Sequence, residues 1–267
     1  MSANNDSIKK TLLVAILLCL VCSIIVAGSA VILKPLQVKN KLEDKKKNIL
    51  AAAGLLVEDK SIEEQFKQVT TRIVNLDTGT YASDSELSEL AANGFPVERF
   101  DQKKLAKNPK FSEKLAGNMD PASIKRKEKF AAVYLVEKEG LIDRIIIPVH
   151  GYGLWSTLYG FIALEGDAKT IAGLGFFSHT ETPGLGGEID NPSWKATWVG
   201  KKVHDASGVI AIDIVKGSVI AGNPNEINQI DGLSGATLTS NGVENLLRYW
   251  LGEQGFAAYL TSLDQGA

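Results

Sequence analysis

The amino-acid sequence predicts an α+β protein: an antiparallel sheet with flanking helices, preceded by one N-terminal transmembrane helix. Three observations lead to this fold class. A long uncharged apolar run occupies residues 11–33. Short apolar or β-branched runs recur between residues 130 and 215, and turns that contain Gly join them. Apolar side chains return at helical spacing after residue 237, so helices stand at both ends of the strand-rich region.

The N-terminal apolar run is long enough to cross a membrane. At about 1.5 Å rise per residue, a helix of this length spans the roughly 30 Å apolar layer of a bilayer. A cleaved signal peptide is the alternative, and residues 27–30 offer small side chains for cleavage. The run exceeds the ~7–15 apolar residues of a signal peptide. We therefore expect a short tail at residues 1–10 and an uncleaved transmembrane helix at 11–34, just before Pro35.

Charge does not fix the orientation of this helix. Two lysines precede the span, and further lysines follow it at positions 34, 39, 41 and 45–47. Taken literally, the positive-inside tendency keeps the C-terminal part in the cytoplasm. The tendency weakens for long translocated domains, so the orientation stays open at this point.

Composition excludes some classes of function for the part after the span. The whole chain has 29 Lys and Arg against 31 Asp and Glu. Three of these basic residues and one acidic residue precede residue 35, which leaves 26 against 30 and a net charge of −4. A nucleic-acid partner is not expected, because no basic excess exists to neutralise phosphates. The only cysteines, Cys19 and Cys22, lie within the predicted span, so no disulfide is expected outside it.

The part after the span divides into two regions. Residues 35–128 are predicted to be a helical or mixed N-terminal region, with a helix at 37–56 and a strand at 72–76 as its clearest signals. Residues 129–267 are predicted to form the main folded core. No Gly-x-Gly-x-x-Gly follows a strand, so the sequence does not indicate a Rossmann site. The strands expected in the core are residues 130–136, 145–149, 159–164, 172–177 and 209–215.

The clearest chemical signal lies near the C-terminus. It reads Asp231-Gly232-Leu233-Ser234-Gly235-Ala236-Thr237. This run resembles the acceptor motif D-x-x-[ST]-[GA]-A-T, in which the last Thr carries FMN through a phosphoester bond. Glycines permit a tight backbone path, and Ala236 leaves space at the hydroxyl of Thr237. Polar residues and then apolar residues at helical spacing follow, so we expect a helix N-terminus whose unpaired N–H groups suit a phosphate.

An ordinary turn and helix cap is the alternative interpretation of this run. Asn241, with Glu244 three residues later, resembles a capping box that needs no cofactor. The aspartate six residues before Thr237 favours the cofactor site.

Two further loops are rich in Gly, at residues 150–157 and 178–188. Ordinary hairpin loops are one interpretation; a pocket for an isoalloxazine ring is the other. The side chains predicted as apolar walls of that pocket are Leu154, Trp155 and Leu185. The groups predicted to meet the polar edge of the ring are Ser156, Glu181, Thr182 and Gly186. A metal site at His179 and Glu181 is disfavoured, because zinc sites usually assemble three or four protein ligands.

Taken together, three motifs behind one N-terminal span resemble one family. They are G-x-G-L-W-S-x-x-Y-G from Gly151, H-x-E-T-P-G-L-G from His179 and D-G-L-S-G-A-T from Asp231. In this order they are similar to the C subunit of the Na⁺-translocating NADH:quinone reductase, an FMN-binding domain family. The related G subunit of the Rnf electron-transport complex shares the Thr-flavin motif and the E-T-P-G loop.

This resemblance implies a covalent flavoprotein. FMN would be attached to Thr237 by a separate flavin transferase that uses FAD and Mg²⁺. Asp231 and Ser234 would serve either transferase recognition or loop geometry, and the sequence does not separate the two. Lys216 would be a charge partner for the flavin or its phosphate, or an exposed hairpin lysine. No residue is predicted to be catalytic in its own right, because the chemistry belongs to the flavin.

The resemblance also implies a location and partners. The protein would be a single-pass subunit of the cell inner membrane, in contact with lipid, with its folded core on the extracytoplasmic side. Other subunits of the complex, which oxidises NADH, reduces ubiquinone and exports Na⁺, would be its partners. Two alternatives remain: a flavoprotein subunit of an Rnf-type complex, and a non-enzymatic membrane-tethered binding domain.

Overall fold

The computed structural model of the protein describes residues 7–264. Its chain forms two compact units that divide between Asp44 and Lys45, and each is described by itself. Residues 8–44 of helix α1, Ile8–Ala52, make up nearly all the described part of the first unit, and the last residues of α1 belong to the second. Of the tail predicted at residues 1–10, positions 1–6 lie outside the described residues.

Helix α1 is longer than the sequence predicts. The predicted membrane helix stops at residue 34 and a second helix starts at residue 37, but α1 continues through Pro35. Proline removes one backbone donor and its ring crowds the carbonyl four residues earlier, which weakens a helix. Leu and Lys residues on both sides favour the helical conformation and outweigh this cost.

Within the described chain, α1 is the one helix that is long and apolar enough to cross a membrane. Its most apolar stretch is not buried inside the protein. Both cysteines, Cys19 and Cys22, are exposed thiols on this helix. The helix therefore has the length and composition that a bilayer requires of a single span.

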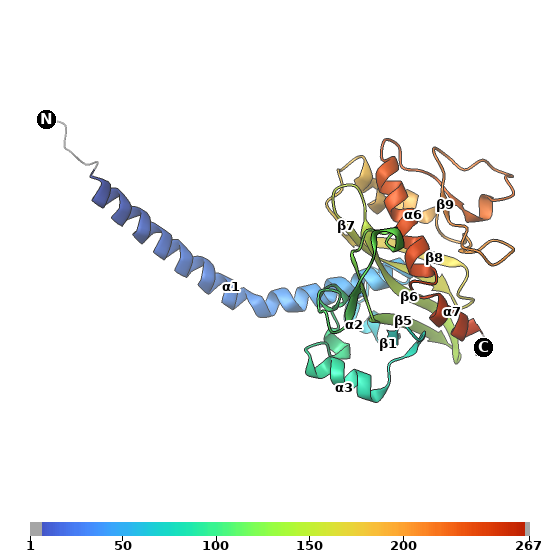
Figure 1. Cartoon of the computed structure of the whole chain (residues 1–267), viewed down its shortest axis with the longest axis horizontal. Coiled ribbons are helices and arrows are strands. Elements are labelled where there is room, and N and C mark those ends of the chain that lie inside the picture. Colours follow the sequence, from blue (N-terminus) through green and yellow to red (C-terminus); the bar gives the residue numbers. More distant parts are fainter. Residues whose placement is uncertain (1–6, 265–267) are drawn as a thin grey trace. The chain divides into compact units, whose positions relative to one another are not determined.

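A six-stranded antiparallel sheet organises the second unit (Figure 1). In the order of the sheet, its strands are β2 Thr80–Tyr81, β1 Val69–Asn75, β5 Phe130–Lys138, β6 Leu141–Tyr152, β7 Thr157–Glu165 and β8 Ile171–Ser178. Glu139 and Gly140 both have positive φ and form the two-residue turn between β5 and β6. The α+β fold predicted from the sequence is confirmed.

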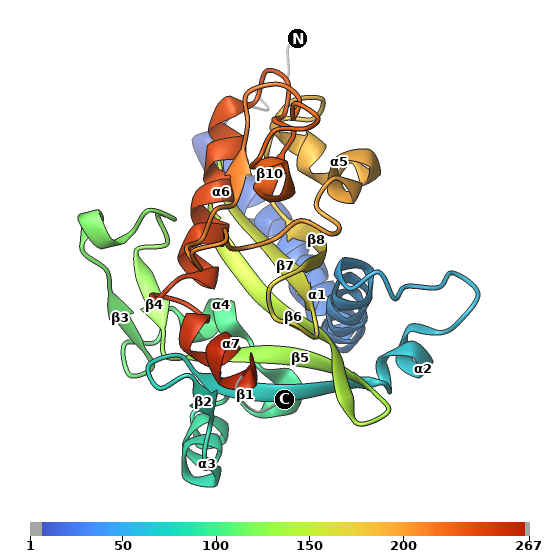
Figure 2. The same ribbon diagram turned by 90° about the vertical axis from the view of Figure 1, so that its right-hand side faces the viewer.

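Both faces of this sheet are buried. Side chains alternate along each strand, so Val133 and Leu135 join one apolar cluster while Ala132 and Tyr134 join the other. Helices α6, Thr237–Leu251, and α7, Ala257–Asp264, cover the first face (Figure 2). The last turns of α1 contribute Ile49 and Ala52 to the cluster on the second face. Burial on both faces explains why the strands read as nearly continuous apolar runs.

Short elements complete the second unit. The short helices are α2 Ile62–Phe66, α3 Asp84–Ala92, α4 Gln102–Leu105, α5 Pro192–Ala196, η1 Val97–Arg99, η2 Gly117–Met119, η3 Gly186–Asp190 and η4 Glu226–Asn228. Two small sheets pair β3 Ser112–Lys114 with β4 Arg126–Glu128, and β9 Asp213–Ile214 with β10 Gln229–Ile230.

The structure can be compared with two predictions from the sequence, the strand at residues 209–215 and the boundary between residues 128 and 129. The strand predicted at residues 209–215 shrinks to β9, because its parallel partner β10 is only two residues long and Val209 is exposed. Strand β1 pairs with β5 along its whole length, so the sheet crosses the proposed boundary between residues 128 and 129. The division of the folded part at that boundary stays a prediction.

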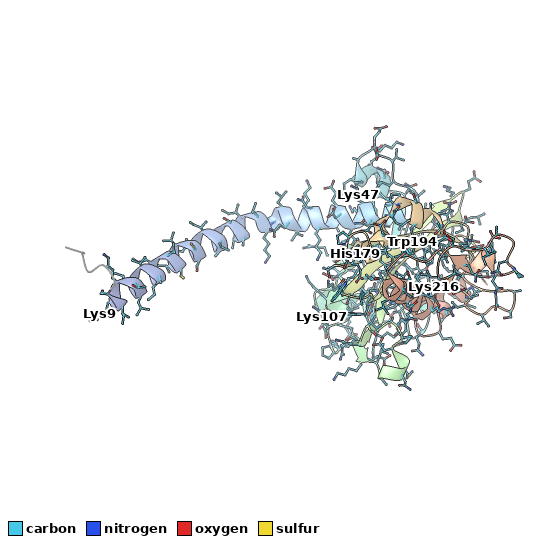
Figure 3. All side chains as sticks on the ribbon, turned by 90° about the horizontal axis from the view of Figure 1, so that it is seen from above. Lys9, Lys47, Lys107, His179, Trp194 and Lys216 are labelled. Atoms are coloured by element: carbon cyan, nitrogen blue, oxygen red, sulfur yellow. The ribbon has the colours of Figure 1, made fainter. Side chains whose placement is uncertain are left out.

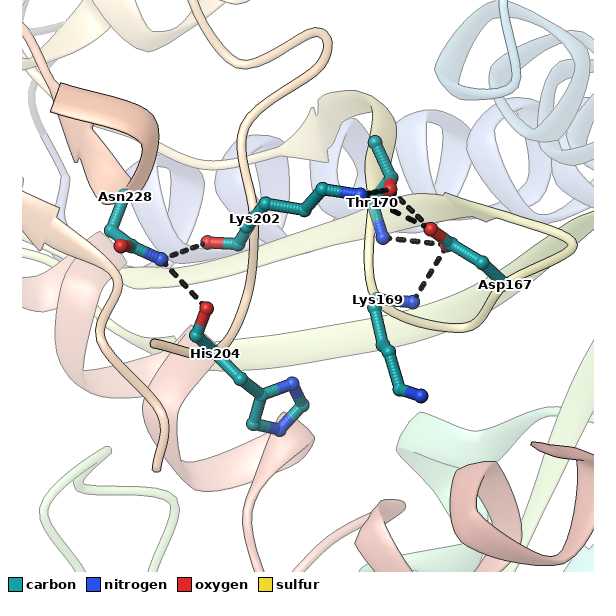
Figure 4. Close-up of polar contacts among 6 residues, drawn as sticks. All are labelled: Asp167, Lys169, Thr170, Lys202, His204 and Asn228. Carbon is teal, nitrogen blue, oxygen red and sulfur yellow. Dashed lines mark hydrogen bonds and ion pairs between the residues drawn. The ribbon is translucent and has the colours of Figure 1, made fainter. Parts of the chain in front are cut away.

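A polar network fastens the turn between β7 and β8 to the segment that follows α5 (Figure 4). Asp167 accepts hydrogen bonds from the backbone N–H groups of Lys169 and Thr170, at 2.9 and 2.7 Å, and from the hydroxyl of Thr170. The ammonium of Lys202 lies 3.3 Å from the same carboxylate. Partial burial alone would raise the pKa of Asp167, but these hydrogen bonds lower it to about 2.

The same segment pairs with the beginning of β8 on its outer side. The N–H of Ile171 donates to the carbonyl of Lys201 at 2.8 Å, and the N–H of Gly200 donates to the carbonyl of Ile171 at 2.8 Å. A single antiparallel bridge pairs Thr170 with Lys202. The last strand of the sheet is therefore partly paired on its open side.

A buried polar group lies beside the sheet around Glu128. Its carboxylate is fully buried, accepts a hydrogen bond from Gln102 and lies 3.9 Å from Nδ1 of His150. The second oxygen, Oε2, has no hydrogen-bond partner in the described structure. Loss of water raises the pKa of Glu128 to about 7, and burial lowers the pKa of His150 to about 4. Both groups are thus shifted toward their neutral forms.

Candidate functional site

The acceptor run forms a tight turn that leads directly into α6. Gly235 has φ of +70°, the left-handed conformation that Gly adopts without a steric penalty. Helix α6 begins at Thr237, which is exposed, and the preceding Ala236 provides no side-chain cap. Ala236 therefore does not cap the N–H groups of the first turn, and the exposed hydroxyl of Thr237 lies at this uncapped helix end.

The capping-box alternative is wrong. Asn241 lies inside α6 rather than before it. Glu244 accepts a hydrogen bond from the N–H of Ile214 at 3.0 Å and pairs with Arg248 at 2.9 Å. The contacts of Glu244 hold α6 to neighbouring structure and leave the helix N-terminus unblocked.

Buried neighbours hold the start of the acceptor run. The indole N–H of Trp194 donates to the carbonyl of Asp231 at 2.8 Å, and the carboxylate of Asp231 accepts from the N–H of Val219 at 2.8 Å. The hydroxyl of Ser240 accepts from the N–H of Leu233 at 3.2 Å. Asp231 therefore has a clear part in loop geometry, whereas Ser234 and Gly235 lie exposed at the tip of the turn.

Lys216 belongs to a segment that runs alongside the acceptor run. The N–H of Gly232 donates to the carbonyl of Gly217 at 2.8 Å, and the N–H of Val215 donates to that of Ile230 at 3.0 Å. Lys216, which is labelled in Figure 3, stands between these two contacts in the sequence and is exposed. The structure thus places this lysine on a segment that contacts the run.

The two Gly-rich loops meet at the carboxylate of Glu181. This side chain is 5% exposed. It accepts hydrogen bonds from the backbone N–H groups of Leu154 at 3.2 Å, Trp155 at 3.0 Å and Ser156 at 3.3 Å. The hydroxyl of Ser156 in turn accepts from the N–H of Thr180 at 2.8 Å. The predicted loop residues 154–156 and 181 therefore lie together.

Helix α6 closes against the second loop. The hydroxyl of Thr239 donates to Oε2 of Glu181 at 2.8 Å. A Cβ on Gly186 would lie 2.5 Å from that hydroxyl, so only Gly fits there. A Cβ on Gly235 would lie 3.0 Å from Cδ2 of Leu185, so this side chain lies beside the acceptor turn.

Helix α6 also touches the first loop. A Cβ on Gly242 would lie 2.6 Å from the carbonyl oxygen of Tyr152 and 2.9 Å from Cα of Gly153. Together with the contacts at Glu181, this brings the three sequence motifs into one region, although Glu181 and Thr239 are 58 residues apart along the chain.

The predicted ring walls are apolar side chains with open surface. Trp155 is 64% exposed, and Leu154 and Leu185 are also exposed. Thr182 is exposed as well, and its carbonyl accepts from the N–H groups of Leu185 and Gly187. Exposed apolar side chains next to an uncapped helix N-terminus fit an FMN group, which combines a flat apolar ring with a phosphate.

His179 has a structural partner. It follows β8 (Figure 3), and its Nδ1 accepts from the N–H of Glu181 at 3.2 Å. Its Nε2 lies 2.8 Å from a carboxylate oxygen of Asp190. These contacts orient the loop that carries Glu181 and occupy both ring nitrogens.

Sequence reasoning missed several residues of this region. Thr239, Ser240, Trp194 and Asp190 all make contacts that fix its shape. A signal existed for the first two, since polar residues on the apolar face of a predicted helix must find partners when buried. The contacts of Trp194 and Asp190 depend on the tertiary fold.

Comparison with known proteins bears on this region. The FMN-binding domain family matches residues 153–252. A Pseudomonas aeruginosa protein, named as the C subunit of Na⁺-translocating NADH-quinone reductase, is 50% identical over 268 residues, 99% of this chain and 99% of that protein. A Vibrio parahaemolyticus protein of the same name is 45% identical over 267 residues, 100% of this chain and 99% of that protein.

Two solved structures share the fold. The crystal structure of Shewanella oneidensis NqrC has a TM-score of 0.75 at 33% identity, covering 85% of this chain and 99% of that one. The C subunit of the Na⁺-translocating reductase from Parabacteroides distasonis has a TM-score of 0.64 at 28% identity, covering 86% and 97%. The chain therefore belongs to the family of C subunits of the Na⁺-translocating NADH-quinone reductase, an oxidoreductase complex, and contains the FMN-binding domain of that family.

Proposed function

We propose that this protein is a membrane-anchored electron-transfer subunit of a Na⁺-pumping NADH:ubiquinone oxidoreductase, with FMN linked through a phosphoester to Thr237. One observation carries the proposal: Thr237 is an exposed hydroxyl at the first residue of an uncapped helix, directly after the Gly235 turn. The acceptor motif in the sequence and the match to the FMN-binding domain support it.

Different residues of this region would bind the phosphate and the ring of FMN. The first turn of α6 would receive the phosphate, because its N–H groups and the helix dipole favour negative charge. Lys216 would add a cation near that end. Leu154, Trp155 and Leu185 would wall the ring and keep water from it. FMN itself supplies the electron carrier when bound, and the protein attaches, shields and tunes it.

The anchor and the partners complete the proposal. Helix α1 would hold the protein in the cell inner membrane, in contact with lipid, with residues 35–267 on the extracytoplasmic side. A threonine hydroxyl does not take up a flavin phosphate unaided, so a flavin transferase would load the protein. The remaining subunits of the complex would supply and accept the electrons.

Replacement of Thr237 tests the attachment. The chain is expressed with a flavin transferase, and flavin is read as fluorescence in a denaturing gel and as added mass on the peptide that contains residue 237. Thr237→Ala is expected to lose both signals without unfolding, because Thr237 is exposed and fills no core volume. Thr182→Ala, which removes another exposed hydroxyl of the same region, is expected to keep both signals.

The outcomes are distinct. Flavin mass on Thr237→Ala, or a wild-type protein that stays dark when the transferase is active on a known acceptor, contradicts the assignment of Thr237. Loss of the signal in Thr182→Ala as well would mean that the region, rather than the one hydroxyl, determines attachment.

A further inference from the structure

The carboxylate of Glu181 is the point at which the three motifs meet. Its Oε1 accepts from the N–H groups of Trp155 and Ser156, the N–H of Leu154 lies 3.2 and 3.3 Å from its two oxygens, and its Oε2 accepts from the hydroxyl of Thr239. Hydrogen bonds to a charged acceptor are stronger than neutral ones. One buried side chain thus fixes the loop that carries Trp155 and the first turn of α6, which begins at Thr237.

The backbone around Glu181 is shaped to admit this carboxylate. A Cβ on Gly153 would lie 2.7 Å from Oε1, and a Cβ on Gly186 would lie 2.8 Å from Oε2. Neither residue has positive φ, so the space taken by the carboxylate, together with the hydroxyl of Thr239 at Gly186, accounts for the glycines. Gly at these two places lets both loops close on Glu181.

Two further contacts, both made by His179, set the position of Glu181 itself. Its N–H donates to Nδ1 of His179, and Nε2 of His179 lies 2.8 Å from Asp190 at the end of η3. The loop is therefore held on both sides of its buried carboxylate.

We propose that Glu181 is a positioning residue that sets the distance and orientation between the acceptor Thr237 and the wall residue Trp155. It acts through Thr239 on one side and through the N–H groups of residues 154–156 on the other. This inference rests on the proposed attachment of FMN to Thr237. Glu181 then gives the tethered ring one fixed environment while leaving the phosphoester untouched.

Glu181→Gln is the sharpest change, because it preserves the size of the side chain. The side chain loses its negative charge, so the hydrogen bonds that it accepts from the N–H groups of residues 154–156 become neutral and weaker, and the hydroxyl of Thr239 loses a charged acceptor. Glu188→Gln is the matched control. It makes the same change of charge in the same loop region, but the carboxylate of Glu188 accepts from the side chain of Asn191 instead.

The first measurement uses the full-length chain in detergent, expressed without a transferase, and needs no flavin. Hydrogen exchange of the amides at residues 154–156 is expected to rise about tenfold or more in Glu181→Gln and to stay at the wild-type rate in Glu188→Gln. Equal exchange in the wild type and Glu181→Gln would overturn the proposal.

The second measurement uses the flavin-loaded chain. Glu181→Gln is expected to carry flavin mass on Thr237 but to lose at least about half of the visible circular-dichroism signal of the flavin, because the ring samples several orientations. Glu188→Gln is expected to match the wild type. An unchanged flavin signal in Glu181→Gln would overturn the positioning role. Absence of flavin on wild-type Thr237 would instead overturn the proposed function, and the exchange measurement would still test the hydrogen bonds of Glu181.

Thr239→Val covers the case in which Glu181→Gln does not fold. This variant removes only the contact to α6. The N–H of Ser240 makes the first backbone hydrogen bond of α6, to the carbonyl of Ala236 at 3.0 Å. Exchange is expected to rise at this amide, with the amides of 154–156 still protected. Unchanged exchange at Ser240 would overturn the inference that Glu181 holds the helix.

Discussion

The carboxylate of Asp231 accepts a hydrogen bond of 2.8 Å from the backbone N–H of Val219, twelve residues earlier in the chain. Asp231→Ala leaves this partly buried donor unpaired, so the free energy of unfolding is expected to fall by about 1 kcal/mol. Asp231→Asn keeps an acceptor oxygen and is expected to stay within about 0.5 kcal/mol of the wild type. Denaturant unfolding of the two variants checks this, and equal losses in both would contradict it.

Glu128 should make stability depend on pH. Its pKa in the folded protein is about 7, above the ordinary value of 4.5, so its contribution is fully present below pH 4.5 and is lost as the pH rises through 7. Glu128→Gln cannot ionise. Its stability relative to the wild type is expected to increase across this interval, by on the order of 3 kcal/mol. Unfolding measured from pH 4.5 to 8 tests this.

The titration of His150 does not disturb this comparison of Glu128→Gln with the wild type. Its pKa is lowered to about 4 from the ordinary 6.5, so its contribution is present above pH 6.5 and is lost as the pH falls toward 4. This loss occurs in both proteins and largely cancels in the difference. A difference that is flat with pH would show that Glu128 does not titrate as its burial requires.

Asp167 is expected to make the stability of the protein depend on pH in the acid range. Its pKa is lowered to about 2 from 3.8, so its stabilising contribution is present above pH 3.8 and is lost as the pH falls through 2. Asp167→Asn is expected to be less stable at neutral pH by no more than about 1 kcal/mol, because the side chain is 42% exposed and solvent screens it. The deficit should vanish near pH 2. Asp59→Asn makes the same change of charge at an exposed position and is the control; its stability at neutral pH is expected to stay within about 0.5 kcal/mol of the wild type.

Removal of residues 1–34 tests the independence of the folded part. The second compact unit starts at Lys45, and both of its apolar clusters are built from residues that follow the removed segment. The fragment is expected to be soluble without detergent and to unfold with the same midpoint as the folded part of the full chain. Precipitation, or a midpoint lowered by more than about 5 °C, would show that the anchor contributes to folding.

Local patterns were sufficient for much of the fold. The strands β5 to β8 were predicted because their apolar runs and Gly turns are local signals, and the start of α6 near Thr237 followed from the change to helical spacing. Residues 209–215 carried the same β-branched signal but formed only β9, since a strand requires a partner of matching length. The local sequence does not determine which segments pair as strands, or over what length they pair.

The site was predictable as a set of motifs but not as a set of contacts. The motifs placed Leu154, Glu181 and Thr237 in one functional group, and the structure brings their loops together. The sequence places Glu181 at the polar edge of the ring, and this role stays a prediction. Its observed bonds to backbone N–H groups depend on how two distant loops fold around it, which only tertiary structure determines.

The pairing of Ile171 with Gly200 and Lys201 has a consequence for behaviour at high concentration. An uncovered strand at the border of a sheet invites the same strand of a second molecule to add to it, which begins aggregation. Here the chain's own segment occupies one border at Ile171, and β2 occupies the other border at Val74 and Asn75. Strand addition by a second molecule is thereby restricted to the rest of β8 and the first residues of β1.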